Sequence, residues 1–426
     1  DLEIYQAATP GTATIFMMLD DTGSMTGSSG CIGNYSSTTI RIAVYPRKLD
    51  ASQPDGLLRG DDGNTVLNKT APFLKDQTIS YNTCKDSSGN IIARTLIERL
   101  KIALVELLSD DVFVGTTLKN TGSLPDDYAI GVGSFTNSYG QVRVPTRELT
   151  AAQRIELIDA VMRLDASGGT PTAEALAESG AYMMGTKAHI NSFNASVSSS
   201  KSGTNYDSSN YISPLSTKEC SGNGIYLLTD GAPNGSDGKS LMNTSLRDSV
   251  IPLSVGSCSG IWGCMNTYAA LLRNTASNSK KLPIKTATVG FGKAFAGLKK
   301  TNEIIVNGKK KPVFDCTSGS NDNAKKLCTL GERKSDNDAK TYGDGGFYYT
   351  ENSEEIAESI VDFSSSLVQI INTAPSGTIT IPEDPYRASN QLPYAYLPML
   401  DPEIVSANSI WKGNLKKYNL DKGTLF

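Results

Sequence analysis

The feature that most constrains the fold is an alternation of apolar segments, typical of buried strands, with segments of helical periodicity. The strand-type segments read TIFMMLD, YAIGVGSF, GIYLLTDG, PIKTATVGFG and GFYYTE. The helix-type segments are 93–111, 151–164, 171–185, 264–275 and 353–372. Apolar strands that alternate with amphipathic helices form mostly parallel sheets covered by helices on both faces. The sequence therefore predicts a Rossmann-like α/β domain.

Three polar stretches interrupt this alternation, at about 26–90, 187–219 and 293–344. They are long for loops of a compact domain, so we interpret them as large insertions that are functional, separately folded or mobile. From residue 375 the sequence changes to short β-like runs with many prolines. We therefore expect an α/β domain over 1–374, followed over 375–426 by a β-rich linker or the start of a C-terminal β-domain.

Composition narrows the class of protein. The chain has 426 residues, 38% of them apolar, which is enough for a large core and for more than one domain. The net charge is −4 and no basic run stands out, so we expect no nucleic-acid partner. No uninterrupted apolar run has the length of a membrane span, so we expect no transmembrane segment. Because the chain begins at Asp1 without a leader, we interpret it as a mature or trimmed fragment.

The seven cysteines favour an exported protein. Most lie in polar, Gly/Ser/Asn-rich surroundings that read as loops, and none forms a CxxC motif. The full set is Cys31, Cys84, Cys220, Cys258, Cys264, Cys316 and Cys328. Local disulfides Cys258–Cys264 and Cys316–Cys328 are expected, and Cys31–Cys84 would close the first insertion. One cysteine is left over. The alternative is a cytosolic protein with reduced cysteines.

Oxygen-bearing side chains follow two of the buried strands and precede one helix. The segments are LDDTGS after the first strand, LLTDGAPN after a later strand, and DASGGTPTAEAL before a helix. In an open parallel sheet, ligands bind beyond the carboxyl ends of the strands. Each loop alone is compatible with ordinary capping and turn chemistry. Together they predict a site for a hard cation, Mg²⁺, Ca²⁺ or Mn²⁺ rather than zinc, at this edge of the sheet.

These three loops resemble those of a von Willebrand factor A domain that has a metal-ion-dependent adhesion site. The family motif is D-x-S/T-x-S in the first loop, a threonine in the second and an aspartate in the third. The resemblance implies that Thr22, Ser24 and Thr170 ligate the ion directly and that Asp20 and Asp230 act through water. It also implies an open coordination position for a carboxylate of the partner. Asp21 occupies the variable position of the motif, where we expect an exposed charge.

A narrower resemblance covers most of the chain. The start DLEIYQ, the large first insertion, the cysteine before IYLLTDG, the segment GGFYYTENSEEIAESI and the closing WKGNLKKYNL resemble the PilC/PilY family of type IV pilus tip-associated proteins. In that family the A domain precedes a β-propeller. The resemblance implies a secreted virulence-associated protein at the pilus tip or the outer surface of a bacterium, with roles in adhesion, pilus biogenesis and twitching motility. The implied partners are a host-cell surface protein, minor pilins of the type IV pilus, or both.

The first insertion also contains an RGD tripeptide, Arg59, Gly60 and Asp61. In an exposed loop it would be a candidate integrin-binding sequence. The surrounding GDDGN has equally the composition of a tight turn.

We expect no catalytic activity. The only histidine, His189, lies beside a polar insertion, and no GxSxG motif accompanies it. Two other functions are compatible with the same three loops. One is an intracellular A-domain subunit of an ATPase-driven chelatase or chaperone. The other is a purely structural pilus-tip component whose metal only rigidifies the loops.

Overall fold

The computed structural model describes most of the α/β part of the chain and several strands near its C-terminus. The described residues are 12–36, 42–45, 81–109, 111–114, 117–120, 124–137, 139–216, 221–247, 253–275, 280–300, 304–306, 309–311, 313–333, 342–368, 374–375, 394–401, 412–421 and 424–425. The chain divides into two compact units. The larger consists of Gly11–Val306 and Lys310–Gln369, and the smaller of Asp1–Pro10, Asn307–Lys309 and Ile370–Phe426.

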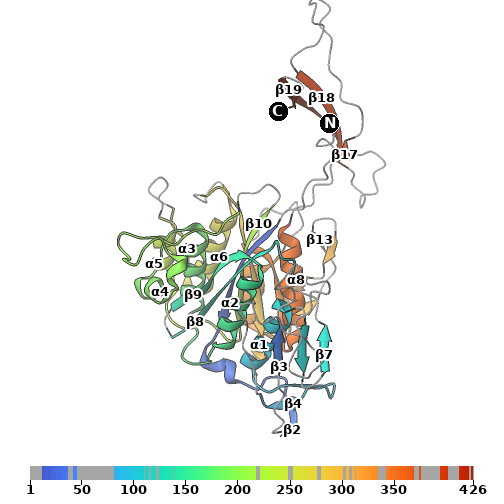
Figure 1. The fold of residues 1–426 in the computed structure, drawn as a ribbon. Helices are drawn as coiled ribbons and strands as arrows, with labels where there is room; N and C mark the ends of the chain where they lie inside the picture. The colour runs from blue at the N-terminus through green and yellow to red at the C-terminus, as the bar shows by residue number, and fades with distance from the viewer. Residues whose placement is uncertain are drawn as a thin grey trace, which may run out of the picture. The chain divides into compact units, whose positions relative to one another are not determined.

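A six-stranded sheet forms the centre of the larger unit (Figure 1). Its strands, in spatial order, are β16 (Asp344–Thr350), β11 (Ile284–Phe291), β10 (Gly222–Thr229), β1 (Ala13–Asp20), β8 (Ala129–Thr136) and β9 (Tyr139–Glu148). All neighbours are parallel except β8 and β9, which form an antiparallel pair. The chain passes from β1 to β8 on one side and later returns to β10 on the other. The strand order therefore reverses between β1 and β10, where open α/β sheets bind their ligands.

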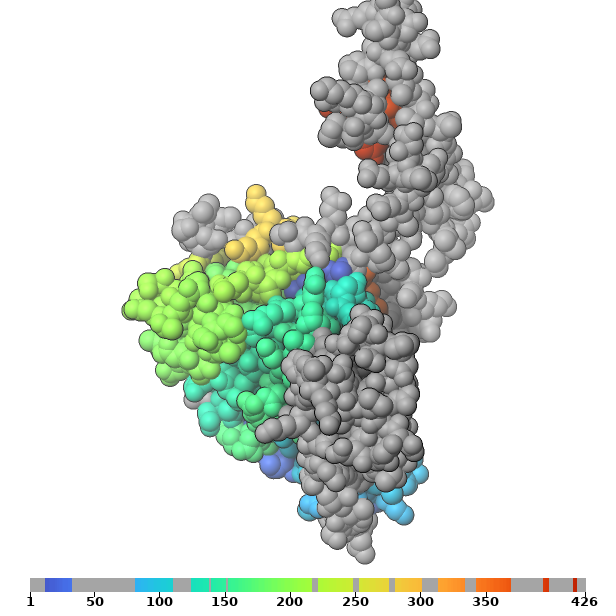
Figure 2. Space-filling model, viewed as in Figure 1, coloured from blue at the N-terminus to red at the C-terminus, as the bar shows by residue number. Residues whose placement is uncertain are grey.

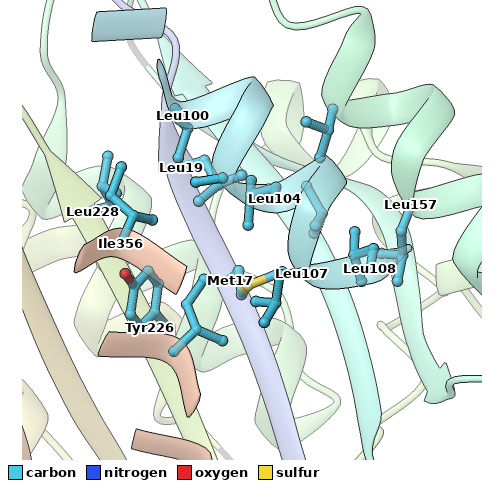
Figure 3. Packing of buried hydrophobic residues seen from close by; sticks show 14 of the residues in the cluster. Met17, Leu19, Leu100, Leu104, Leu107, Leu108, Leu157, Tyr226, Leu228 and Ile356 are labelled. Atoms are coloured by element: carbon cyan, nitrogen blue, oxygen red, sulfur yellow. The ribbon is translucent and has the colours of Figure 1, made fainter. Parts of the chain in front are cut away.

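Helices cover both faces of this sheet, which confirms the predicted fold class. One face is covered by α1 (Leu96–Leu108), α2 (Ala151–Met162) and α8 (Ser353–Leu367). The other is covered by α3 (Thr172–Met184), α5 (Lys239–Ser245), α6 (Gly260–Arg273) and α7 (Asp322–Gly331). Figure 3 shows the first of these layers, where Met17 and Leu19 of β1 meet Leu104 of α1. Every residue of β1 is buried, as its apolar sequence predicts.

The first and third interruptions contain short strands. Antiparallel strands β2 (Ile32–Ser36), β4 (Thr83–Lys85) and β5 (Ile91–Ala93) form one small sheet. β3 (Ile42–Tyr45) pairs with a hairpin of β6 (Asp111–Val114) and β7 (Thr117–Asn120), a segment for which the sequence analysis predicts no element. The 293–344 range contains η4 (Lys293–Phe295), β12 (Lys299–Lys300), β13 (Ile304–Val306), β14 (Lys309–Lys311) and β15 (Phe314–Asp315). It also contains α7, whose buried leucines pack on the central sheet.

The segment after α3 packs against the rest of the larger unit. It contains α4 (Ile190–Ala195) and η3 (Ser198–Ser200), and Phe193 and Tyr211 are buried with the core residues of α3. In Figure 2 its surface is the lime-green region at the left. In the smaller unit, the described strands form an antiparallel sheet, so a β-rich region follows the α/β unit. These strands are β17 (Ala374–Pro375), β18 (Tyr394–Asp401), β19 (Lys412–Asp421) and β20 (Thr424–Leu425).

Candidate metal centre

Asp20 is the last residue of β1 and links the ends of two neighbouring strands. Its side chain is fully buried because the strand itself lies at the centre of the sheet. Its Oδ1 accepts hydrogen bonds from the backbone N–H (2.9 Å) and the hydroxyl of Thr22. Its Oδ2 accepts from the Thr229 hydroxyl (2.8 Å) and the Asp230 backbone N–H (3.2 Å). The carboxylate therefore joins the loops after β1 and β10 at the point where strand order reverses.

A chain of hydroxyl groups connects Asp20 to Asp230. The hydroxyl oxygens of Thr22 and Ser24 are 3.1 Å apart. The Ser24 hydroxyl donates to Asp230 Oδ1 at 2.6 Å, and the Thr170 hydroxyl donates to Thr22 Oγ1 at 3.4 Å. Ser24 is exposed, whereas Thr22, Thr170 and Asp230 are buried. The structure thus brings all five predicted ligand residues into one network that reaches the surface at Ser24.

Backbone and amide contacts hold the second loop against the first and third. The Gly23 N–H donates to the carbonyl of Gly168 (3.0 Å), which has a positive φ of 74° that favours glycine. The Thr170 N–H donates to Asn234 Oδ1 (2.8 Å), and the Asn234 N–H donates back to the Thr170 carbonyl (2.9 Å). Sequence reasoning missed Asn234 as a residue that positions Thr170. The Asn-Gly pair in APNGSDG signals a turn there.

The Asp20 and Asp230 carboxyl groups are both buried, and their pKa values are both raised. Burial, and after it the nearby Asp230 carboxylate, raise the pKa of Asp20 to about 7. Burial also raises the pKa of Asp230 above its ordinary value. In the part of the chain that the structure describes, no lysine, arginine or histidine forms an ion pair with either aspartate. A cation placed between them would lower the electrostatic cost of both charges.

Asp21 differs from its expected role as an exposed charge, and that expectation is wrong. Its side chain is only 2% exposed and forms an ion pair with Arg143 of β9, Oδ2 to Nη2, at 3.3 Å. The Arg143 Nε also donates to the Ser134 hydroxyl at 2.9 Å. Burial raises the pKa of Asp21 to about 6, although Ser134 and Arg143 oppose the shift. The strand β9 beside β8 supplies this partner, which the motif around Asp21 does not indicate.

The chemistry of the donors fits a hard divalent cation. All five predicted ligand side chains offer oxygen, which suits Mg²⁺, Mn²⁺ or Ca²⁺ better than zinc. Over the described ranges, no group of three or more His, Cys, Asp or Glu side chains is placed to hold a metal ion. The candidate centre is therefore a mixed one, with two carboxylates and three hydroxyls. Among the described residues, histidine and cysteine side chains form no alternative metal site.

The structure forms all three disulfides that the sequence predicts: Cys31–Cys84, Cys258–Cys264 and Cys316–Cys328. The loop setting expected for them is only partly right. Cys264 lies in α6 and Cys328 in α7, and both are buried. Both belong to the buried cluster on the α3 face of the sheet.

Other predicted residues lie elsewhere or outside the described part of the chain. Arg59, Gly60, Asp61 and Cys220 fall outside the described residues, as does the start DLEIYQ. His189 caps α4, where its Nδ1 accepts from the Asn191 N–H at 3.2 Å. None of the described helices is long and apolar enough to cross a membrane.

Comparisons with known proteins give weak similarities only. No protein-family model and no curated protein matches the chain. A von Willebrand factor type A protein from Catenulispora acidiphila is 10% identical, with a TM-score of 0.34 over 98% of this chain and 68% of its own. The pilus adhesin SpaC from Lactobacillus rhamnosus GG is 11% identical, with a TM-score of 0.35 over 92% and 37%. The proximal thread matrix protein 1 of the mussel byssus, solved with a zinc-occupied MIDAS motif, is 10% identical, with a TM-score of 0.32 over 83% and 45%. Similarities this low support no conclusion about function, so the metal-site interpretation depends on the three loops themselves.

Proposed function

We propose that this chain is an extracellular adhesion protein, associated with the type IV pilus, that binds a carboxylate of a partner protein through a divalent cation. Thr22, Ser24 and Thr170 would ligate the ion, Mg²⁺ before Ca²⁺ or Mn²⁺. Asp20 and Asp230 would hold its water molecules and supply compensating negative charge. The partner's carboxylate would complete the coordination shell. The partner would be a host-cell surface protein or a minor pilin.

The observation that carries this proposal is the contact network of Asp20 and Asp230 with three hydroxyls at the reversal of strand order. Two buried carboxylates this close together raise each other's free energy unless a cation or a proton joins them. A structural ion pair would supply a lysine or an arginine, as Arg143 does for Asp21. Among the described residues no basic side chain pairs with Asp20, so we infer that a bound cation supplies the compensating charge.

An extracellular location is supported by the three disulfides, since such bonds persist mainly in oxidising compartments. They argue against the alternative of an intracellular subunit of a chelatase or chaperone. The association with pili rests on the sequence resemblance to the PilC/PilY family. We propose no catalytic role, since the three hydroxyls and two carboxylates of the site would be engaged in holding the ion and its water molecules.

Isothermal titration calorimetry of the full chain tests the metal step. We expect saturable binding of Mg²⁺ or Mn²⁺ that is lost in Asp20→Ala and in Asp230→Ala. Asp237→Ala is the matched control, because Asp237 is an exposed aspartate in the same loop as Asp230. The proposal would be refuted if both site variants still bind the cation. It would also be refuted if the wild type binds none of the cations. If Asp230→Ala lowers stability but leaves partner binding intact, the metal is structural only.

A further inference from the structure

A second surface with the properties of a binding site lies at the edge of the central sheet, away from the metal loops. The edge strand β16 pairs with β11 on one side, and no described strand pairs with its other side. Its sequence, DGGFYYT, contains no lysine or proline of the kind that protects exposed edges. An unprotected edge offers backbone N–H and C=O groups to an extended segment of another chain.

Arg333 covers the first half of this edge. Its Nε donates to the Gly345 carbonyl at 2.9 Å, and its Nη1 donates to Asp362 of α8 at 2.8 Å. The guanidinium lies 5.5 Å from the centre of the Tyr348 ring. The side chain is nearly fully buried. This part of the edge therefore already holds a cation between a carboxylate and an aromatic ring.

The second half of the edge, from Phe347 to Tyr349, borders a cavity of about 220 Å³. One wall is formed by Lys300 and Phe314, and the ring of Phe314 packs edge-on against that of Phe347, with centroids 5.3 Å apart. Helix α8 also contributes to the lining. There the cavity is lined by Glu355, Glu358, Ser359 and Asp362. The cavity thus joins a strand edge, four aromatic rings and three carboxylates.

The charges of the cavity favour a cationic occupant. Asp362 is paired with Arg333, but Glu355 and Glu358 are exposed and form no ion pair with any described residue. Lys300 lines the cavity with its Nζ 5.6 Å from the Phe314 ring. With Arg333 and Lys300 set against Asp362, Glu355 and Glu358, these side chains keep one net negative charge. Carboxylates next to a tyrosine ring are groups that hold lysine or arginine side chains. The buried Arg333 shows that the same strand and helix accommodate a guanidinium.

We propose that this groove, defined by Phe347 to Tyr349, Phe314, Glu355 and Glu358, docks an extended segment of a partner protein that carries a lysine or arginine. The segment pairs with the outer edge of β16. Its cationic side chain lies beside the Tyr349 ring and interacts with Glu355 and Glu358. The interaction needs no metal ion, so its test is independent of the proposed adhesion function.

The test uses a fluorescent peptide of alternating threonine and valine with one central lysine, titrated with the full chain and followed by fluorescence anisotropy. We expect the lysine peptide to bind roughly tenfold more tightly than the same peptide with glutamate or norleucine at its centre. The Glu355→Gln/Glu358→Gln variant should lose this preference. Glu354→Gln, on the same helix turn but outside the cavity, should keep it. Methylation of alternate peptide nitrogens should abolish binding, because it removes donors for strand pairing.

Equal binding of the lysine and glutamate peptides would overturn the proposal, as would the absence of binding up to about 1 mM peptide. Sedimentation gives a further refutation. If the chain dimerises and Glu355→Gln/Glu358→Gln disrupts the dimer, the occupant is a second copy of this chain. Chelation of divalent ions should leave peptide binding unchanged, and so should Asp230→Ala. The peptide experiment therefore tests the groove proposal separately from the metal-site proposal.

Discussion

Glu178 should make the stability of this protein fall as the pH rises. The side chain lies on α3 and is fully buried. Its Oε1 accepts from the Tyr211 hydroxyl at 2.5 Å and its Oε2 from the His189 N–H at 3.4 Å. The ionisable groups that interact with it are Tyr211, Tyr206 and Tyr268, and no cation is among them. Burial raises the pKa of Glu178 to about 8, although the three hydrogen bonds that it accepts oppose the shift.

The direction of the pH effect follows from proton uptake. Between the ordinary pKa of 4.5 and the folded pKa of about 8, the folded protein holds a proton that the unfolded chain releases. The free energy of unfolding therefore decreases over this window and levels off above it. Each pH unit corresponds to about 1.4 kcal/mol, which sets an upper limit of about 5 kcal/mol for the full window. Water entry and relaxation around a buried charge reduce such costs. We expect a loss of about 2–3 kcal/mol between pH 5 and pH 8.

Glu178→Gln removes the charge and keeps an acceptor for Tyr211. The variant should match the wild type near pH 5 and exceed its free energy of unfolding by about 2–3 kcal/mol near pH 8. Urea unfolding at a series of pH values measures the difference. Glu355→Gln is the control, since it makes the same chemical change at an exposed position. A difference between Glu178→Gln and wild type that does not change with pH would refute the reasoning.

Three further changes test the packing and the covalent framework. Gly180→Ala should lower the free energy of unfolding by about 1–2 kcal/mol despite the better helix propensity of alanine, because the added Cβ would lie 2.1 Å from the Tyr268 hydroxyl. Tyr268→Phe in the same chain should restore part of this stability, as measured by chemical denaturation. Thr95→Ala removes the capping box at the start of α1 and should cost about 1 kcal/mol, measured as a lower urea midpoint. Replacement of both Cys316 and Cys328 by serine removes a disulfide with a sequence separation of 12 and should cost about 3 kcal/mol. Thermal unfolding without reductant measures this loss, and added reductant should destabilise the wild type more than the variant, which keeps only the other two disulfides.

The sheet and its helices could be predicted because their signals are local. The continuous apolar sequence of β1 predicts a buried strand, and the helical periodicity of α1 predicts a helix with one buried face. The convergence of the loops after β1 and β10 could be predicted for a related reason. Once Asp20 and Asp230 are assigned to the carboxyl ends of parallel strands, the topology of such sheets brings them to one edge.

The packing of the insertions could not be predicted in this way. Every residue of helix α3 is buried, so α3 has no exposed polar face. The hydrophobic periodicity of its sequence therefore does not indicate whether Glu178 is buried or exposed. The partner that accounts for Glu178 is Tyr211, in a stretch whose composition resembles that of a loop. The contact joins residues 33 positions apart. Only the folded chain shows that this stretch ends in a hydrogen bond to a buried acid.

Asp20 and Asp21 show the limit of a motif most directly. They are neighbours in sequence, both carboxyl groups are nearly fully buried, and burial raises both pKa values. Side chains alternate across a strand, so the two residues face different surroundings. Asp21 meets Arg143, a cation of the protein's own, and becomes part of the scaffold. Asp20 meets Thr22, Thr229 and Asp230 instead, and no described basic side chain forms an ion pair with it. The structural aspartate and the candidate metal ligand therefore differ in the side chain that each one contacts on a neighbouring strand or loop. The order of the strands determines these contacts, whereas the sequence motif does not indicate them.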